Sequence, residues 1–421
     1  MGSGDRFDVA IVGASVAGCT AARLFARAGM RVALIERRPD PAAYKVVCTH
    51  QILPSATPTI ERLGLAPLLD ARGVPRTDAE FWTPHGGWFG FPFDGSHGYG
   101  VTRRTLDPLV RELAAGTPGV ELLAGHTVVG LLTEDGRPVG VEVRGPQGAV
   151  ASLRARLLVG ADGRGSTVAR LARVPGRVLP NNRFFYFAYW HGVRPSDACA
   201  RGWLLDPDAA ALFPNEDGLT VLAVAPHRSR LPEFQADREG AYARMLAALP
   251  DPPDLSGAER VSKLIGKLEM PNVIRSAAKP GLAFVGDAAL AADPLFGVGC
   301  GFAFQSAEWL ADETTGPLLG NGELDTALTR YRRKFARRLG PHHLQIAEYA
   351  SGRKTTPWER AVFRAATTDT VVSSAVGEVI ARRKSPLRLD PRVIAHVLTH
   401  GHRRPQPTAT SHHATKVRVT T

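Results

Sequence analysis

Phe7-Asp-Val-Ala-Ile-Val-Gly-Ala-Ser-Val-Ala-Gly18 is the stretch of this 421-residue chain that decides its fold. Residues 7–12 are apolar nearly throughout, which is typical of a buried parallel strand. Residues 16–28 are rich in Ala and free of Pro, so they predict a helix, and residues 31–35 predict a second strand. The chain therefore opens with a β-α-β unit of the Rossmann type.

A glycine turn lies between the first strand and the helix. Residues 13–18 have the G-x-G-x-x-G pattern, with Ser15 at the middle position. The helix that begins here aims unpaired N–H groups and the positive end of its dipole at a pyrophosphate. Glu36 ends the second strand, where an acid accepts hydrogen bonds from ribose hydroxyls, so FAD or NAD is favoured over NADP. The dinucleotide contacts predicted in this unit are Gly13, Ser15, Ala17, Gly18, Glu36 and Arg37.

Two later segments repeat the combination of a strand, a turn and a helix. In the first, a strand ends before Asp162-Gly163, and Ser166 is placed to cap a short helix. In the second, Asp287 follows a buried strand and is placed to hold ribityl or ribose hydroxyls. Glycines after it open a helix whose N–H groups can face the N1–O2 edge of a flavin. The contacts predicted in this last segment are Asp287, Pro294, Gly297, Gly299, Cys300 and Gly301.

As an ordered set these three motifs, which span roughly residues 8–315, resemble the class A flavoprotein monooxygenases, the para-hydroxybenzoate hydroxylase-like enzymes. The resemblance implies bound FAD and NADH or NADPH as a transient co-substrate. It also implies that Asp162 serves both FAD and the nicotinamide cofactor, and that Asp287 binds the FAD ribityl chain. Arg103 matches the arginine that approaches the FAD pyrophosphate, with Arg104 as the competing choice. Ser15 for the middle glycine and Leu290, at a position that is often His in relatives, depart from the family pattern.

The expected fold is α/β: a Rossmann-like FAD-binding domain, an inserted and mostly antiparallel substrate sheet, and a C-terminal helical region. The FAD-binding domain is predicted over residues 1–75, 101–175 and 276–320, and the substrate sheet over 76–100 and 176–275. Helices are expected over 321–399 and a disordered tail over 400–421. Within the first region, Thr57-Pro58 predicts the N-cap and first residue of a helix, and another helix is expected to begin near Leu106.

The scaffold supports several reactions, so the motifs alone leave the chemistry open. The resemblance favours hydroxylation of an aromatic or polycyclic small molecule with O2 through a flavin C4a-hydroperoxide, in secondary metabolism. Flavin halogenases carry a W-x-W-x-I-P strand and a lysine, whereas residues 209–214 here read Ala-Ala-Ala-Leu-Phe-Pro. Geranylgeranyl-type prenyl reductases have an aromatic-Phe-Pro motif, of which Phe213-Pro214 remains. A non-catalytic flavoprotein is the remaining alternative.

Candidate catalytic residues lie in the loop at 44–51, which contacts flavin and substrate in relatives. Lys45 and His50 are the candidates there, and Lys45 is also the lysine that a halogenase would need. His85, His97 and His191 leave the choice of a general base open. An apolar lid over the flavin is expected from Trp82, Trp88, Phe91, Phe185, Phe187 and Tyr189.

The net charge and the cysteine content limit the partners and the cellular compartment that we expect for this protein. The net charge is +12, and residues 321–421 carry 19 Lys and Arg against 7 Asp and Glu, so the whole excess lies at the C-terminal end. This region is expected to be a solvated helix face, or to steer an anionic partner such as a phosphopantetheine-carrying protein or a nucleotide, and not to bind nucleic acid. The four cysteines have no metal-ligand spacing. Without a secretory or membrane-spanning apolar run, a cytoplasmic protein is expected.

Overall fold

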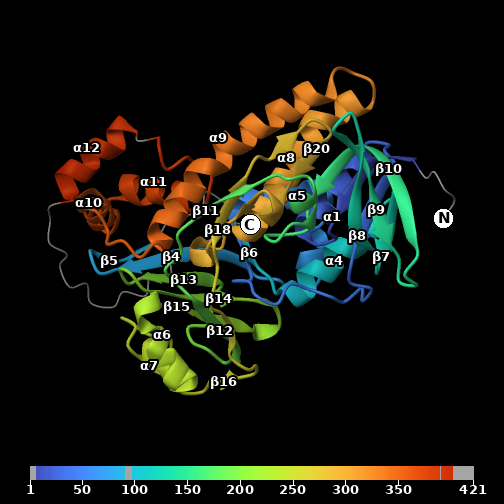
Figure 1. The fold of residues 1–421 in the computed structure, drawn as a ribbon. Coiled ribbons are helices and arrows are strands. Elements are labelled where there is room, and N and C mark those ends of the chain that lie inside the picture. The colour runs from blue at the N-terminus through green and yellow to red at the C-terminus, as the bar shows by residue number, and fades with distance from the viewer. Residues whose placement is uncertain (1–5, 91–96, 389, 402–421) are drawn as a thin grey trace, which may run out of the picture.

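The opening β-α-β unit has the predicted structure. A computed structural model describes residues 6–90, 97–388 and 390–401 of the protein (Figure 1). Strand β1 (Arg6–Val12), helix α1 (Val16–Arg27) and strand β2 (Val32–Glu36) each lie within a residue of the expected bounds. Because β1 and β2 pair in parallel and are covered by helices, their inner residues are buried.

A largely parallel sheet brings the three motifs to one edge. Its strands run in the order β19 (Ala278–Lys279), β20 (Leu282–Phe284), β10 (Val150–Gly160), β1, β2, β7 (Val120–Ala124), with β8 (Thr127–Glu134) and β9 (Arg137–Arg144) added beside β10. Val12 lies opposite Gly160, and Gly160 lies opposite Phe284. The turns after β1, β10 and β20 therefore leave the sheet side by side at its carboxyl edge, where ligands bind in open α/β sheets.

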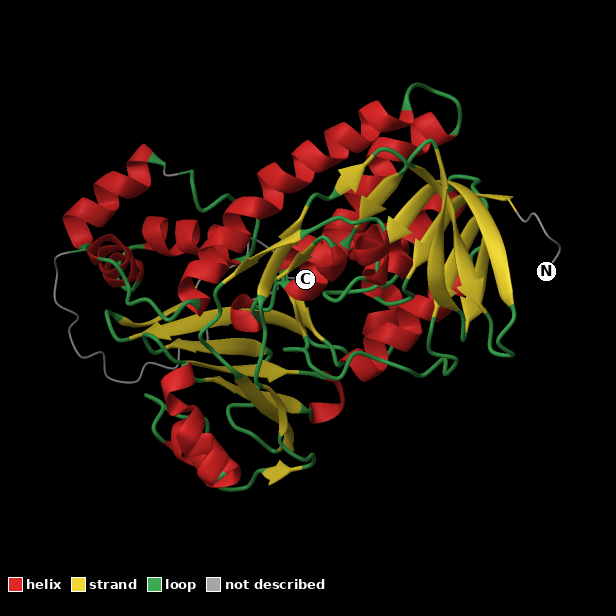
Figure 2. Cartoon of the chain, in the orientation of Figure 1, coloured by secondary structure: helices red, strands yellow, loops and turns green. Residues whose placement is uncertain are grey.

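A second sheet is mostly antiparallel, as predicted. Its main order is β16 (Glu259–Arg260), β12 (Phe185–His191), β15 (Thr220–Ala225), β14 (Ala209–Pro214), β13 (Cys199–Leu204), β4 (Arg76–Thr83), β6 (Gly98–Gly100), β3 (Gln51–Ile52), and only β4 and β13 among these neighbours pair in parallel. Figure 2 shows this layer apart from the first sheet. One of its faces packs against α6 (Leu231–Ala236) and α7 (Arg238–Ala247), which gives this sheet a core of its own.

Helices cover the rest of the molecule. Helix α8 (Gly299–Leu318) packs against α1, and the long α9 (Leu324–Ala350) leads to α10 (Pro357–Ala366), α11 (Thr370–Ile380) and α12 (Pro391–His400). Figure 1 shows α9 running from the first sheet toward these last helices. The predicted C-terminal helical region is thus present, whereas the tail beyond Gly401 lies outside the described residues. In the described part of the chain no helix is long and apolar enough to span a bilayer.

Two predicted helix starts were wrong. Helix α2 (Thr57–Leu63) has Ala56 as its N-cap, because the short 3-10 turn Pro54–Ala56 runs directly into it. The Thr57 hydroxyl instead donates to the carbonyl oxygen of His97. Helix α4 (Arg103–Ala115) begins before Leu106, since the Thr102 side chain caps it by accepting a hydrogen bond from the Thr105 N–H.

Candidate functional site

The turn between β1 and α1 is tightly packed, and its glycines are required by neighbouring backbone. Gly13 has a φ of +107°, and a Cβ there would lie 2.5 Å from the carbonyl oxygen of Ala161. A Cβ on Gly18 would overlap the carbonyl oxygen of Gly13. Ser15 precedes the helix in an extended conformation, and its side chain makes no capping hydrogen bond. The first N–H groups of α1 therefore lack a side-chain cap and are available to an anion.

Glu36 holds this turn. The Ala14 N–H donates to its Oε2 at 2.9 Å, and the Arg38 N–H donates to Oε1 at 3.0 Å. Burial alone would raise the pKa of Glu36, but these hydrogen bonds and the Arg38 guanidinium lower it, so the carboxylate is ionised at neutral pH. Arg37 is exposed, and its neighbour Arg38, which the sequence analysis did not single out, is the residue that pairs with Glu36.

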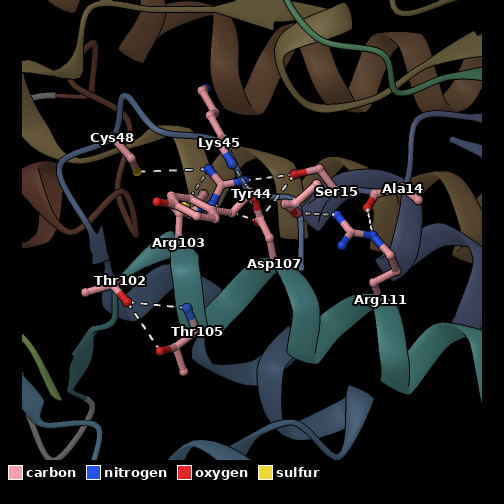
Figure 3. A network of polar contacts seen from close by, with 12 residues as sticks. Ala14, Ser15, Tyr44, Lys45, Cys48, Thr102, Arg103, Thr105, Asp107 and Arg111 are labelled. Atoms are coloured by element: carbon pink, nitrogen blue, oxygen red, sulfur yellow. Dashed lines mark hydrogen bonds and ion pairs between the residues drawn. The ribbon is translucent and has the colours of Figure 1, made fainter. Parts of the chain in front are cut away.

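Arg103 lies beside the same turn (Figure 3). Its Nη2 donates to Ser15 Oγ at 2.8 Å, and its Nε and Nη2 donate to Asp107 Oδ1 at 2.8 and 2.6 Å. The Arg103 side chain is 5% exposed and that of Asp107 is 0% exposed. Arg104, the competing choice, is exposed and lies over the Tyr44 ring. The structure thus places Arg103 where a pyrophosphate at the α1 turn would meet it.

Two further residues support this corner and were missed from the sequence. Arg111 is buried, and its Nε donates to the Ala14 carbonyl oxygen at 3.1 Å while Nη2 donates to that of Ala43 at 2.8 Å. Glu216, from the turn after β14, accepts hydrogen bonds from the Thr102 N–H and hydroxyl at the start of α4. Glu216 stands in an Asn-Glu-Asp-Gly stretch that reads as an ordinary surface turn, so nothing local marked it.

Asp162 has a structural task in addition to its predicted one. Its Oδ1 accepts from the Ser166 hydroxyl at 2.5 Å, and its Oδ2 accepts from the Thr167 N–H at 2.6 Å. The carboxylate therefore caps helix α5 (Thr167–Leu171), together with Ser166 as the predicted N-cap. Gly163 and Gly165, which flank this turn, have open space where a Cβ would stand.

Asp287 and Lys45 meet at the end of β20. Asp287 lies in the 3-10 turn Gly286–Ala288, and Lys45 Nζ donates to its Oδ2 at 2.8 Å. The side chains are 23% and 47% exposed, so both can reach a ligand. Burial would raise the pKa of Asp287, but the Lys45 ammonium outweighs it and lowers that pKa; Asp287 in turn raises the pKa of Lys45. Both groups are charged at neutral pH.

The start of α8 completes the arrangement. Its N-cap, Val298, offers no side-chain acceptor, and nothing lies within 4 Å of where a Gly299 Cβ would stand. A Cβ on Gly286 would lie 2.9 Å from that of Ala17, so α1 and the Asp287 turn pack closely. Ala17 therefore contributes through packing. Pro294 lies in the 3-10 turn Pro294–Phe296, and Gly297 has a φ of +65°.

These features fit FAD. Two uncapped helix N-termini, a buried guanidinium beside the α1 turn and an ionised carboxylate after β20 all adjoin one edge of the sheet. Gly13 and Gly18 let the turn pack closely on Ala161 and on itself, and Gly299 leaves open space at the start of α8. Bound FAD would be held by the α1 turn, Arg103 and Asp287.

His50 and Tyr189 lie where the second sheet meets this site. His50 is buried with a φ of +59°, and its Nδ1 accepts from the Arg103 N–H at 3.0 Å. Its Nε2 must then carry the proton and donate to Tyr189 Oη at 2.7 Å. Burial lowers the pKa of His50 and raises that of Tyr189, so both are neutral at pH 7.

Cys48 and Cys300 also meet here, which the sequence did not indicate. Arg103 Nη1 lies 4.0 Å from the sulfur of Cys48 and 3.8 Å from that of Cys300, so the two thiols share one guanidinium. Cys300 thus contacts the side chain of Arg103 as well as filling space beside the glycines.

The three histidines left open by the sequence have other partners. His85 bonds to Thr355, His97 to Asp78, and His191 to the carbonyl oxygen of Gly218. All three pairs lie on the second sheet or between it and the C-terminal region.

The predicted aromatic lid is only partly correct. Phe187 and Tyr189 contact the His50 ring, with centroids 5.7 and 5.3 Å away. Trp82 and Trp88 instead pack into the core beneath α6 and α7, because alternate residues of a strand face opposite sides of the sheet. Phe91 lies outside the described residues.

Comparisons with known proteins agree with this geometry. A family model described as an FAD binding domain matches residues 6–339. Digeranylgeranylglycerophospholipid reductase 2 of Methanothermobacter thermautotrophicus is 26% identical, with 80% of this chain and 84% of that protein covered. The myxobacterial chondrochloren halogenase CndH has a similar structure, with a TM-score of 0.72, 22% identity, and 94% and 96% of the two chains covered.

A third similar protein is PqsL of Pseudomonas aeruginosa, described as a probable FAD-dependent monooxygenase. Its structure superposes with a TM-score of 0.68 and 21% identity, over 89% of this chain and 99% of PqsL. Since the family model spans well over half of the chain, the protein belongs to the FAD binding domain family and is an FAD-dependent oxidoreductase with the class A monooxygenase-like fold that its motifs predicted.

Proposed function

We propose that the protein is a monooxygenase that uses FAD, NADH or NADPH, and O2 to hydroxylate an aromatic or polycyclic small molecule in secondary metabolism. The observation that carries this proposal is the His50–Tyr189 pair at the junction of the two sheets. A phenol and an imidazole, both neutral and both backed by aromatic rings, suit the handling of a hydroxyl group on an aromatic substrate.

The hydrogen bonds decide which member of the His50–Tyr189 pair donates and which accepts. Because His50 Nε2 donates to Tyr189 Oη, the phenolic O–H of Tyr189 is left to donate elsewhere. Tyr189 can therefore orient an oxygen atom of the substrate and hold a proton at its Oη. His50 is fixed in this tautomer by the N–H of Arg103, the same residue whose side chain adjoins the phosphate turn.

The positions of the other site residues suggest which of them bind FAD and which exclude water. FAD, when bound, supplies the redox chemistry with the nicotinamide cofactor and O2. The α1 turn, Arg103 and Asp287 bind it, and the buried rings of Phe185 and Phe187 exclude water from the substrate side.

The test is consumption of NADH and NADPH by the FAD-loaded protein across a panel of phenols, with isotope-labelled O2. We expect one labelled oxygen atom in the product, and a loss in kcat of about tenfold or more for Tyr189→Phe with an unchanged flavin spectrum. NAD(P)H consumption that no phenol stimulates, or a Tyr189→Phe variant as fast as the wild type, would contradict the proposal.

A prenyl reductase is the second candidate, favoured by the similarity to an archaeal phospholipid reductase and by Phe213-Pro214 at the end of β14. The two reactions differ in their need for oxygen. A reductase would saturate an isoprenoid double bond under strict anaerobiosis, whereas the proposed reaction would stop.

A halogenase is a third candidate, because CndH shares the fold and Lys45 is available beside Asp287. The same assay with chloride or bromide added distinguishes a halogenase from the proposed hydroxylase. A halogenated product that is lost in Lys45→Met would favour it over hydroxylation.

A further inference from the structure

A large cleft lies between the C-terminal helices and the body of the protein. Its volume is about 1300 Å³, more than the few hundred to 1000 Å³ of most small-molecule sites. It is bounded by α9 to α12 on one side and by residues 54–61, Phe296 and α8 on the other. Its aromatic lining consists of Tyr99, Phe296, Trp309, Tyr349, Trp358 and Phe363. The cleft can therefore hold a large and mainly apolar molecule.

One wall of the cleft belongs to the segments that form the flavin site. Phe296 stands between Asp287 and the start of α8, in the loop that carries Pro294 and Gly297. Ser55 follows closely on His50, and Gln51 lies against Gly297, whose Cβ would be 3.3 Å from that of Gln51. A molecule in the cleft would reach these loops, so the inference below rests on the proposed function.

Arg382 is the unusual residue of the opposite wall. Its side chain lines the cleft although the residue is only 6% exposed, and its guanidinium stacks on Phe296 with 4.9 Å between its carbon and the ring centroid. It follows α11 with a φ of +64°, at the helix-terminating position where glycine is usual. An arginine in the left-handed conformation at this position indicates that its side chain is needed there.

The hydrogen bonds of Arg382 leave one edge of the guanidinium unpaired. Nη1 donates to His342 Nδ1 at 3.0 Å and to Gln345 Oε1 at 3.3 Å. Gln345 is a neutral amide, and His342 is neutral because burial and Arg382 lower its pKa to about 3. Nε and Nη2 are buried without a hydrogen-bond partner in the described part of the chain. Burial without a counter-ion lowers the pKa of Arg382 to about 9, so the group is still a cation at pH 7.

That unpaired edge is the one with which arginine binds oxyanions. In this same protein Arg230 donates through Nε and Nη2 to one carboxylate oxygen, Oε2 of Glu233, at 3.1 and 3.0 Å. A carboxylate or a phosphate group fits the parallel N–H bonds of that edge. A buried cation with an unsatisfied edge is costly in an empty cleft, and an anionic ligand offsets that cost.

Other polar atoms of the cleft also lack partners. Ser55 Oγ, Tyr99 Oη and Gln305 Oε1 line it and are buried without a hydrogen bond among the described residues. They come from the 3-10 turn Pro54–Ala56, strand β6 and helix α8, not from the C-terminal helices. Two hydroxyl donors and an amide acceptor suit the hydroxyl or carbonyl groups of an oxygenated ring system.

Most of the charged side chains that line the cleft are basic, like Arg382. Its basic lining includes Arg337, Arg338, Arg382, Arg383, Lys384 and Arg388, against the acidic Glu61, Glu359 and Asp390. Glu359 already pairs with Arg353, and Asp390 caps α12. Part of the basic excess at the C-terminal end of the sequence therefore faces a cavity and does not simply cover an outer helix face.

We propose that this cleft binds the substrate as an organic oxyanion, with its carboxylate or phosphate on the Nε–Nη2 edge of Arg382 and its oxygenated ring system extending past Ser55, Tyr99 and Gln305 toward the His50–Tyr189 pair. The substrate class is thus an aromatic or polycyclic acid or phosphate ester, and neutral polycycles are poor ligands.

Isothermal titration of the FAD-loaded protein, without NAD(P)H, tests this proposal. The probes are 2-naphthoate, 2-naphthyl phosphate and methyl 2-naphthoate, which share a ring system and differ in charge. We expect at least one of the two anions to bind about tenfold or more tightly than the ester, and the tighter anion identifies the group. Arg382→Met, which keeps the aliphatic stem on Phe296, should abolish the preference. Arg333→Gln, an exposed arginine of α9 outside the cleft, should keep it.

The results that overturn the proposal are equal affinity for the ester and both anions, a preference that survives in Arg382→Met, or an equal loss in Arg333→Gln. Folding is checked by the melting temperature without ligand, which Arg382→Met should not lower, since it removes a buried unpaired cation. The titration involves no turnover. Failure of hydroxylation with intact anion binding would therefore refute only the proposed function, and the reverse result would refute only this inference.

Discussion

The Arg103–Asp107 pair offers a sharp test of how the flavin corner is held together. The closest N–O distance is 2.6 Å, and the two side chains are 5% and 0% exposed. Asp107→Asn keeps the shape and an acceptor for the Lys45 N–H but leaves Arg103 as an uncompensated buried cation. Removal of one partner from a buried ion pair costs about 3–5 kcal/mol, and we expect that loss in the free energy of unfolding of the apoprotein.

The matched control is Glu134→Gln. Arg154 and Glu134 are paired at 2.7 Å, nearly the same distance, but their side chains are 52% and 57% exposed. Exposed pairs contribute about 0–1 kcal/mol, so burial is the variable that differs. Urea unfolding of both apoproteins measures the effect, and excess FAD should restore more stability to Asp107→Asn than to the control, because its phosphates give Arg103 a counter-ion. A loss in Asp107→Asn no larger than that in Glu134→Gln would refute the reasoning.

Three further outcomes are expected. Asp287→Ala should lose about tenfold or more in FAD affinity and purify without a flavin spectrum, because hydrogen bonds to a charged carboxylate are lost; a yellow, holo-like variant would contradict the assigned role. Gly18→Ala should lower both the melting temperature and the flavin content, since its Cβ would overlap the Gly13 carbonyl oxygen, whereas Gly340→Ala in α9, with open space around it, should add up to about 1 kcal/mol. Burial would raise the pKa of Glu359, but Arg353 and the Thr356 N–H outweigh it and lower that pKa to about 2. The stabilisation by Glu359 is therefore complete above pH 4.5 and is lost as the pH falls toward 2, so thermal melts of wild type and Glu359→Gln should converge across that window, and a constant difference would argue against it.

Local patterns predicted much of the fold because they describe short-range physics. The apolar run at residues 7–12 and the glycine turn depend mainly on near neighbours, and Glu36 reaches the Ala14 N–H within the same β-α-β unit. The role of Arg103 could also be predicted from the sequence, since its sequence context resembles a family motif. Helix starts at Thr57 and near Leu106 were wrong because capping depends on which side chain is free to bond, and that is set by contacts such as Thr57 to His97 and Thr102 to Glu216.

The sequence by itself determined that this chain folds around a dinucleotide turn and carries three motifs in the order of a flavin enzyme. Only the tertiary structure decided which side chains meet at the common edge of the sheet. Arg103 at Ser15, His50 at Tyr189 and Cys48 at Cys300 join residues from distant parts of the chain. The physical reason is that a strand or turn is specified by neighbouring residues, whereas a buried hydrogen bond or an unpaired guanidinium such as that of Arg382 depends on how whole sheets and helices pack.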